Sequence, residues 1–254
     1  MGKDRQGDVK AAGRTLDLFE IFARQLAPLS LSELAQLMDI PVSSTHALVK
    51  TLRARGFLYV LENRKRIYPT RRMQVLANQI AGMDPVVEIL APTLQALQEA
   101  SGETLMLGKR QGDMVIYLDV VESRSAIRYS PQPGERKPLH SSAIGKAMLS
   151  LETDEAIRQT LETVGQPRIT ANTLTDPAAL IADIRQGREQ GVFITRGENV
   201  VDLMGMATLV RLGEESVGIA IGGPLSRMME KERTCRELLA AARQDIAAME
   251  AAPI

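Results

Sequence analysis

The chain has 254 residues, and its 31 lysines and arginines are balanced by 31 aspartates and glutamates, so its formal net charge is zero. Its single cysteine excludes a disulfide framework within the chain, and no apolar run has the length of a membrane-spanning helix. This length suits two domains of ordinary size. We therefore expect a two-domain cytoplasmic protein with no membrane partner.

The N-terminal part begins with two amphipathic helices. Residues 14–26 carry apolar faces that can pack within the domain and against a second subunit. Residues 31–38 repeat apolar side chains at three- and four-residue spacing, and serines at their start can cap the helix. Pro41 breaks the chain, because proline lacks an amide hydrogen and restricts the residue before it. A third helix is therefore predicted to begin near Ser43 and to end at Gly56.

This third helix has the polar start of a helix that reads DNA. Its apolar face is predicted to hold Ala47, Leu48, Thr51 and Leu52, which leaves the hydroxyl side chains at its start facing outward. A helix in the major groove presents base-contacting side chains from its first turns, while later cations reach phosphate. We assign base contacts to Ser43, Ser44, Thr45 and His46, and a phosphate contact to Lys50.

A short basic hairpin follows the third helix. Residues 57–61 and 66–68 are predicted as strands on either side of a turn at 62–65. Further phosphate contacts are assigned to Arg14, Arg64, Lys65 and Arg66. On a lone helix, outward polar residues would indicate only a solvated face. Helix, break, helix and basic hairpin in this order favour a DNA-binding winged helix-turn-helix domain over residues 1–69.

The charge distribution supports the same interpretation. Residues 1–72 contain 13 lysines and arginines against 7 acidic residues, a balance of +6, so the remaining residues carry 18 against 24, or −6. A basic part followed by an acidic part suits a protein whose first domain contacts phosphate and whose second domain has another role.

Residues 70–84 are predicted to form a linker helix and a joint, and residues 85–254 a second domain. In that domain, strands are predicted at 104–109, 114–121, 126–130, 192–196, 204–210 and 216–221, and helices at 85–100, 143–150, 154–164, 177–190 and 227–250. Strands, then helices, then strands and a closing helix indicate an α+β domain with one sheet and helices packed on it.

Three sequence blocks resemble the IclR family of transcriptional regulators. They are RGFL at 55–58, GERKPLHSSAIGKAML at 134–149 and GIAIGGPLSR at 218–227. The resemblance implies a winged helix joined to a GAF-like α/β effector-binding domain, and homodimers assembling into tetramers that regulate catabolic operons. We expect N-terminal helices to pair two subunits, with reader helices roughly 34 Å apart on a pseudo-palindromic operator in double-stranded DNA. The linker helix would transmit effector binding.

The resemblance also implies the position of a small-molecule effector site. Its residues would be Tyr129, Ser141, Ser142, Ala143, Ile144, Gly145, Thr195, Leu203, Gly205, Ala220 and Gly222. Exposed amides at the start of the helix at 143–150 could bind a carboxylate, with Gly145 allowing close approach. Small, weakly polar walls predict a bulky ligand, such as an aromatic or branched acid or its amide, unless they only reflect repacking.

The sequence also allows two other classes of function. His140 beside Ser141 could belong to a hydrolase, but neighbours in sequence rarely have triad geometry, and the chain has neither a GxSxG motif nor zinc-ligand spacing. We therefore expect a protein without catalytic activity, metal or cofactor. A winged helix that binds protein is the other alternative, which the salt dependence of DNA binding would test. The effector, the operator and the choice between repression and activation stay open.

Overall fold

The structure is a computed structural model that describes residues 9–61, 65–81 and 84–251. The chain divides into two compact units, Met1–Asp84 and Pro85–Ile254, and each is described by itself. In the described residues no helix is both long and apolar enough to cross a membrane.

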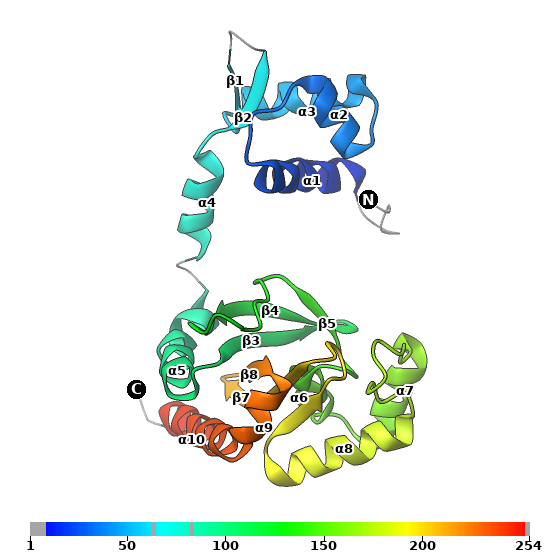
Figure 1. The fold of residues 1–254 in the computed structure, drawn as a ribbon, viewed down its shortest axis with the longest axis vertical. Coiled ribbons are helices and arrows are strands. Elements are labelled where there is room, and N and C mark those ends of the chain that lie inside the picture. Colours follow the sequence, from blue (N-terminus) through cyan, green and yellow to red (C-terminus); the bar gives the residue numbers. More distant parts are fainter. Residues whose placement is uncertain (1–8, 62–64, 82–83, 252–254) are drawn as a thin grey trace. The chain divides into compact units, whose positions relative to one another are not determined.

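The first unit is a small helical domain with a hairpin (Figure 1). Its elements are α1 (Lys10–Gln25), α2 (Leu31–Met38), α3 (Val42–Ala54), β1 (Leu58–Leu61), β2 (Arg66–Pro69) and α4 (Arg72–Ala81). The two strands pair antiparallel from Leu58 opposite Pro69 to Leu61 opposite Arg66. Side chains from α1, α2, α3 and both strands form one apolar core, whereas α4 buries none of its residues. This is the predicted winged helix-turn-helix arrangement.

Local sequence signals fix the start of α2 and the turn between α2 and α3. Ser30 and Glu33 form a reciprocal cap on α2: the Ser30 amide donates to Glu33 Oε2 at 2.7 Å, and the Glu33 amide donates to Ser30 Oγ at 3.3 Å. Asp39 ends α2 in the left-handed region, and Pro41 stands at the start of α3. The break between the helices is therefore local, as the sequence predicts.

The second unit is built on an antiparallel sheet of six strands in the order β5-β4-β3-β8-β7-β6. The strands are β3 (Thr104–Gln111), β4 (Met114–Val121), β5 (Arg136–Pro138), β6 (Phe193–Arg196), β7 (Leu203–Leu212) and β8 (Glu215–Pro224). The helices are α5 (Pro85–Ser101), α6 (Ala143–Leu149), α7 (Asp154–Val164), α8 (Pro177–Gln190), α9 (Leu225–Glu230) and α10 (Glu232–Ala251). The α+β fold class is confirmed.

Side chains alternate between two cores on the two faces of this sheet. One face packs against α5, α9 and α10 around residues such as Leu94, Ile219 and Leu239. The other face packs against α6, α7 and α8 around residues such as Ile144 and Ala220. Figure 1 shows α5 and α10 together on one side, and α7 and α8 together on the other. Helices therefore cover both faces of the sheet, and α6 lies directly on one of them.

Two predicted elements of the second unit are wrong. Residues 126–130 form no strand. The Tyr129 carbonyl accepts a hydrogen bond from a side chain, Thr104 Oγ1, at 2.6 Å, and not from the backbone of a neighbouring strand. The strand that pairs with β4 is instead β5. The sequence did not indicate it, because it has only three residues and ends in a proline. The predicted helix over 227–250 is two helices that meet at Lys231, whose ammonium donates to the Ser101 carbonyl at 2.9 Å.

Candidate DNA-binding surface and effector cavity

The outer face of α3 is polar, as predicted. Ser43, His46 and Lys50 are exposed, and Ser44 is half-buried beside them. The helix begins at Val42 without a side-chain cap, so the hydroxyl of Ser43 is not used to cap it. These side chains have the types and the position that major-groove contacts require, and their roles as base contacts stay a prediction.

Thr45 corrects the predicted base-contacting set. Its side chain is fully buried, and its hydroxyl donates to the Pro41 carbonyl at 3.2 Å. The buried face of α3 consists of Thr45, Val49 and Leu52, whereas Ala47 and Thr51 are exposed, so the predicted apolar face is wrong at these two positions. A threonine can occupy this core position because the carbonyl four residues earlier satisfies its hydroxyl. Thr45 thus supports α3 from within and does not face a base.

Arg66 on β2 also differs from its predicted role. Its Nη1 atom lies 2.7 Å from Glu33 Oε2, its Nη2 atom donates to Glu33 Oε1 at 3.2 Å, and Nη1 also donates to the Pro28 carbonyl at 3.0 Å. The Ser30 amide and hydroxyl, together with Arg66, hold the pKa of Glu33 below its usual value. Arg66 therefore fastens the hairpin to the start of α2, so a phosphate contact is not its main role.

The other predicted phosphate contacts keep their charges available. Lys50 and Lys65 are exposed, Arg14 on α1 is half-buried, and Arg64 lies outside the described residues. In the part of the chain that the structure describes, none of Arg14, Lys50 and Lys65 has an ion-pair partner. Arg53 and Arg55, to which no phosphate contact was assigned from the sequence, are also exposed and extend this basic end of α3. Their position after the first turns of α3, where cations can reach phosphate, was the signal in the sequence that could have identified them.

A small cavity lies beneath α6 in the second unit. Its volume is about 30 Å³, the room that a single water molecule takes. Ten of the eleven residues predicted for the effector site line it, namely Tyr129, Ser141, Ser142, Ala143, Ile144, Thr195, Leu203, Gly205, Ala220 and Gly222. Four further residues complete the wall: Met106, Tyr117, Lys137 and Asn199. Strands and loops distant in sequence thus meet around one space.

Gly145, the eleventh predicted residue, does not line the cavity. A Cβ at this position would lie 2.2 Å from the Leu139 carbonyl oxygen, so the glycine lets α6 pack against the preceding backbone. Its amide donates to Ser142 Oγ at 3.2 Å, while the Ser142 hydroxyl donates to the Pro138 carbonyl at 2.7 Å. The expectation that Gly145 admits a ligand is therefore wrong, because its close neighbour is the chain itself.

Lys137 on β5 brings a cation to the cavity wall. Its side chain is 11% exposed, and its ammonium lies 2.6 Å from Glu135 Oε1 and 5.7 Å from the centre of the Tyr129 ring. Burial alone would lower the pKa of Lys137, but hydrogen bonds to Glu135 and Tyr129 raise it above its usual value. Burial raises the pKa of the neighbouring Tyr117 phenol. Both groups therefore stay protonated at neutral pH.

The loop between β6 and β7 closes the cavity. The amide of Asn199 donates to the Ser141 hydroxyl oxygen at 3.1 Å. Thr170 donates to the Gly197 carbonyl at 2.6 Å, and Thr173 donates to the Glu198 carbonyl at 2.7 Å. Side-chain hydrogen bonds from Thr170 and Thr173 therefore hold this loop, and the bond from Asn199 to Ser141 joins two residues of the cavity wall.

A buried ion cluster ties the same loop to α6 and α8. Lys146 is fully buried, and its ammonium lies 2.8 Å from both Glu198 Oε1 and Asp183 Oδ2 and 3.1 Å from the Ile194 carbonyl. Glu198 Oε2 is buried without a hydrogen-bond partner among the described residues, and burial raises the pKa of this carboxyl despite Lys146. The block at 134–149 signalled a site, but nothing local revealed the two carboxylates.

The small wall residues do not leave the cavity roomy. A Cβ on Gly222 would lie 3.0 Å from the Met106 terminal methyl and 3.5 Å from the Tyr129 ring. A Cβ on Gly205 would lie 3.1 Å from Thr195 Oγ1. Larger neighbours thus fill the space that these glycines leave, and the flexible Met106 is the one that moves most easily.

The structure removes the hydrolase alternative. Nε2 of the buried His140 lies 3.1 Å from the Pro167 carbonyl, and the Ser141 hydroxyl interacts with Asn199. Burial lowers the pKa of His140, so the ring is neutral at pH 7 and donates this hydrogen bond. The described residues contain no cluster of three or more potential metal ligands, and burial raises the pKa of Cys235 to about 11. A histidine that caps a loop cannot activate the serine next to it.

Comparison with known proteins gives the family. The sequence model for the IclR helix-turn-helix domain matches residues 11–62, and that for the bacterial transcriptional regulator IclR C-terminal domain matches residues 79–248. The HTH-type transcriptional regulator BhcR of Paracoccus denitrificans is 33% identical over 237 residues, which cover 91% of this chain and 83% of BhcR. The repressor AllR of Escherichia coli K12 is 29% identical over 228 residues, covering 89% and 84%.

Solved structures share the fold. The IclR protein of Thermotoga maritima superposes with a TM-score of 0.81 at 21% identity, covering 96% of this chain and all of that one. An IclR homologue from Microbacterium hydrocarbonoxydans, solved in complex with 4-hydroxybenzoate, has a TM-score of 0.73 at 20% identity, covering 94% and 99%. Together with the two matched domains, these findings make the chain a DNA-binding transcriptional regulator of the IclR family and not an enzyme.

Proposed function

We propose that this regulator binds a pseudo-palindromic operator of a catabolic operon as a cytoplasmic dimer or tetramer, and that a small organic acid in the cavity beneath α6 changes its affinity for DNA. The observation that supports this most is the composition of the cavity wall. Ser141, Ser142, Thr195 and Asn199 supply hydroxyl and amide groups, Lys137 supplies a cation, and no carboxylate lines the cavity in the described residues. Such a wall stabilises an anion better than a neutral ligand.

This wall favours an acid over the corresponding amide, a choice that the sequence left open. The Lys137 ammonium is largely buried, so a carboxylate that shares it with Glu135, or displaces Glu135 from it, would interact with little screening by water. An amide gains no such Coulombic attraction. The 4-hydroxybenzoate complex of the Microbacterium homologue supports an aromatic acid as the first compound to examine.

The size of the cavity implies that effector binding moves its wall. A space of about 30 Å³ cannot hold an aromatic acid, so Met106 or the loop at 197–202 has to shift. A ligand regulates only if it binds one arrangement more tightly than another, and a coupling of about 1–3 kcal/mol changes DNA affinity several-fold to about a hundred-fold. Displacing Asn199 from Ser141 supplies such a difference between closed and open states.

The first unit supplies the DNA contacts in this proposal. Ser43, Ser44 and His46 would contact bases, and Arg14, Lys50 and the basic turn with Arg64 and Lys65 would contact phosphates. Leu16 on α1 is 62% exposed, which supports pairing of two subunits through the N-terminal helices. The α4 helix, at the end of this unit, would carry the response.

The test is binding of the full-length protein to the intergenic DNA beside its gene, over a salt series, with matched pairs such as 4-hydroxybenzoate and 4-hydroxybenzamide. We expect specific binding that weakens steeply with salt and responds to acids more than to amides. Lys137→Met should reduce the response to acids roughly tenfold. Lys109→Met, which removes an exposed lysine paired with Glu215, is the matched control and should leave it unchanged.

Two results would contradict the proposal in different places. Loss of specific DNA binding at low salt would overturn the assignment of the first unit. An equal response to acid and amide, or an unchanged response in Lys137→Met, would overturn the organic-acid effector while leaving the DNA-binding surface in place.

A further inference from the structure

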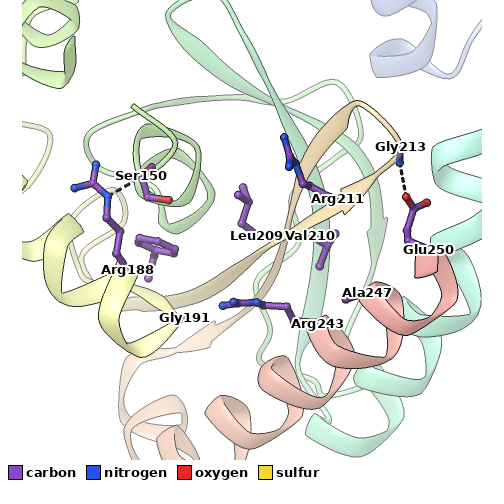
Figure 2. Close-up of a pocket in the computed structure, with 11 residues that line it drawn as sticks. Ser150, Arg188, Gly191, Leu209, Val210, Arg211, Gly213, Arg243, Ala247 and Glu250 are labelled. Carbon is purple, nitrogen blue, oxygen red and sulfur yellow. Dashed lines mark hydrogen bonds between the residues drawn. The ribbon is translucent and has the colours of Figure 1, made fainter. Parts of the chain in front are cut away.

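A second hollow lies at the edge of the sheet, away from the effector cavity. It has a volume of about 590 Å³ and shares no lining residue with that cavity. Leu209, Val210 and Phe193 supply its apolar surface, with Ala247 of α10 beside them. Figure 2 shows Leu209 and Val210 between Arg188 of α8 and the C-terminal half of α10. We call this hollow the edge groove.

The edge groove exposes part of a strand that has only one neighbour. β6 pairs with β7 from Arg196 opposite Met204 to Phe193 opposite Ala207, so residues 209–212 of β7 are paired with β8 alone. The Gly197 amide donates to the Leu203 carbonyl at 2.8 Å, which fixes the odd-numbered residues of β7 as those directed towards β6. The amides and carbonyls of Leu209 and Arg211 therefore face the open side.

The edge groove also contains unpaired charge, which is unusual in this unit. Among the described residues from 85 onward, Arg124, Arg211 and Arg243 are the cationic side chains without an ion pair or hydrogen bond, and the last two line the groove. Arg211 comes from β7 itself and Arg243 from α10, where its guanidinium lies against Gly191. Both side chains are exposed. The groove is therefore a cationic surface around a free strand edge.

The two ends of the edge groove are already held within the chain. At one end Arg188 pairs with Asp154 at 2.8 Å and donates to the Ser150 carbonyl at 3.0 Å. At the other end Glu250 accepts the Gly213 amide at 2.7 Å. Figure 2 shows Arg211 and Arg243 on opposite sides of Leu209 and Val210, so they do not converge on one small anion. An elongated anionic partner can reach both.

We propose that the edge groove binds an acidic segment of a partner protein in extended conformation, which adds as a strand to β7 and pairs its carboxylates with Arg211 and Arg243. The backbone amides and carbonyls of Leu209 and Arg211 form the hydrogen bonds to the added strand. The apolar residues that line the groove contact those side chains of the partner that do not pair with the arginines. A second copy of this chain fits poorly, because two β7 edges paired about a two-fold axis would bring like-charged arginines together.

The test uses the full-length protein and three fluorescent hexapeptides with capped ends. One repeats two glutamates and a valine, so that carboxylates lie on both faces of the added strand. One has lysine in place of each glutamate, and the third has the acidic sequence with proline at a central position. We expect the acidic peptide to bind at least roughly tenfold more tightly than the other two, since proline removes a ladder donor. Hydrogen exchange at the Leu209 and Arg211 amides should slow when the acidic peptide is bound.

Charge-reversal variants locate the binding. Arg211→Glu with Arg243→Glu should weaken the acidic peptide by roughly tenfold or more, whereas Arg233→Glu, on the exposed face of α10, should have little effect. Equal binding of the proline peptide, or unchanged binding by the double variant, would overturn the proposal. So would peptide binding without protection of the two β7 amides, since the basic first unit also attracts acidic peptides.

Discussion

The two units of this regulator use their positive charges in opposite ways. In the first unit most cations have no side-chain partner among the described residues, namely Arg14, Arg24, Lys50, Arg53, Arg55, Lys65 and Arg71. In the second unit nearly all the described cations are paired, and Lys146, with its two carboxylates, is fully buried. Unpaired surface cations keep their charge available for a polyanion, whereas paired interior cations fix the positions of loops.

This difference explains where sequence change should be tolerated. A free surface lysine contributes little to folding, so its loss affects binding alone. A buried cation holds its neighbours in place, and its removal leaves a carboxylate in a medium that solvates it poorly.

Lys146→Met should cost the second unit about 3–5 kcal/mol of unfolding free energy, because Glu198 and Asp183 lose a buried partner. Lys109→Met, which breaks an exposed pair, should cost less than about 1 kcal/mol. Urea unfolding followed by a probe in the second unit measures both. Similar costs for the two variants would refute the distinction between interior and surface cations.

Gly145→Ala should destabilise the second unit by about 1–3 kcal/mol or more, since its Cβ would overlap the Leu139 backbone. Gly13→Ala on α1 is the matched change in the first unit. No atom lies within 4 Å of a Cβ built there, and the residue is inside a helix, so stability should rise by roughly 0.5–1 kcal/mol. Thermal unfolding of each variant checks the sign, and a stable Gly145→Ala protein would contradict the packing.

Lys50→Gln should weaken operator binding and reduce the slope of log affinity against log salt by about 0.9, as expected for one lost phosphate contact. Arg66→Gln should weaken binding through a loosened hairpin while leaving that slope nearly unchanged, because Arg66 is engaged by Glu33 and Pro28. Filter binding between low and moderate salt separates the two. Equal slope changes would return Arg66 to the phosphate contacts.

Elements with strong local signals were predictable from the sequence. The helix at 154–164 starts after a capping threonine and ends at Gly165, and the helix at 177–190 has Asp176 and Pro177 at its start and Gly191 at its end. Their predicted bounds are those of α7 and α8. The bounds of α3 and its exposed Ser43, His46 and Lys50 were also predictable, but its faces were only partly so, since Thr45 is buried while Ala47 and Thr51 are exposed.

Features set by distant contacts were not predictable. The carboxylates that meet Lys146 come from segments 37 and 52 positions away (183 − 146 and 198 − 146), and no local pattern joins them. Lys137 reaches the cavity wall because β5 pairs with β4, and a three-residue strand ending in proline gives little signal. Thr45 was misplaced because its packing against the core, not its polarity, decides which way it faces.

The small cavity also implies a time scale for the effector response proposed above. An organic acid would enter a space of about 30 Å³ only when its wall opens, so its association rate would be limited by how often the loop held by Asn199 releases Ser141. Departure would wait for the same event. A regulator built in this way would average the concentration of its effector over many openings, and brief fluctuations would pass without changing which genes are read.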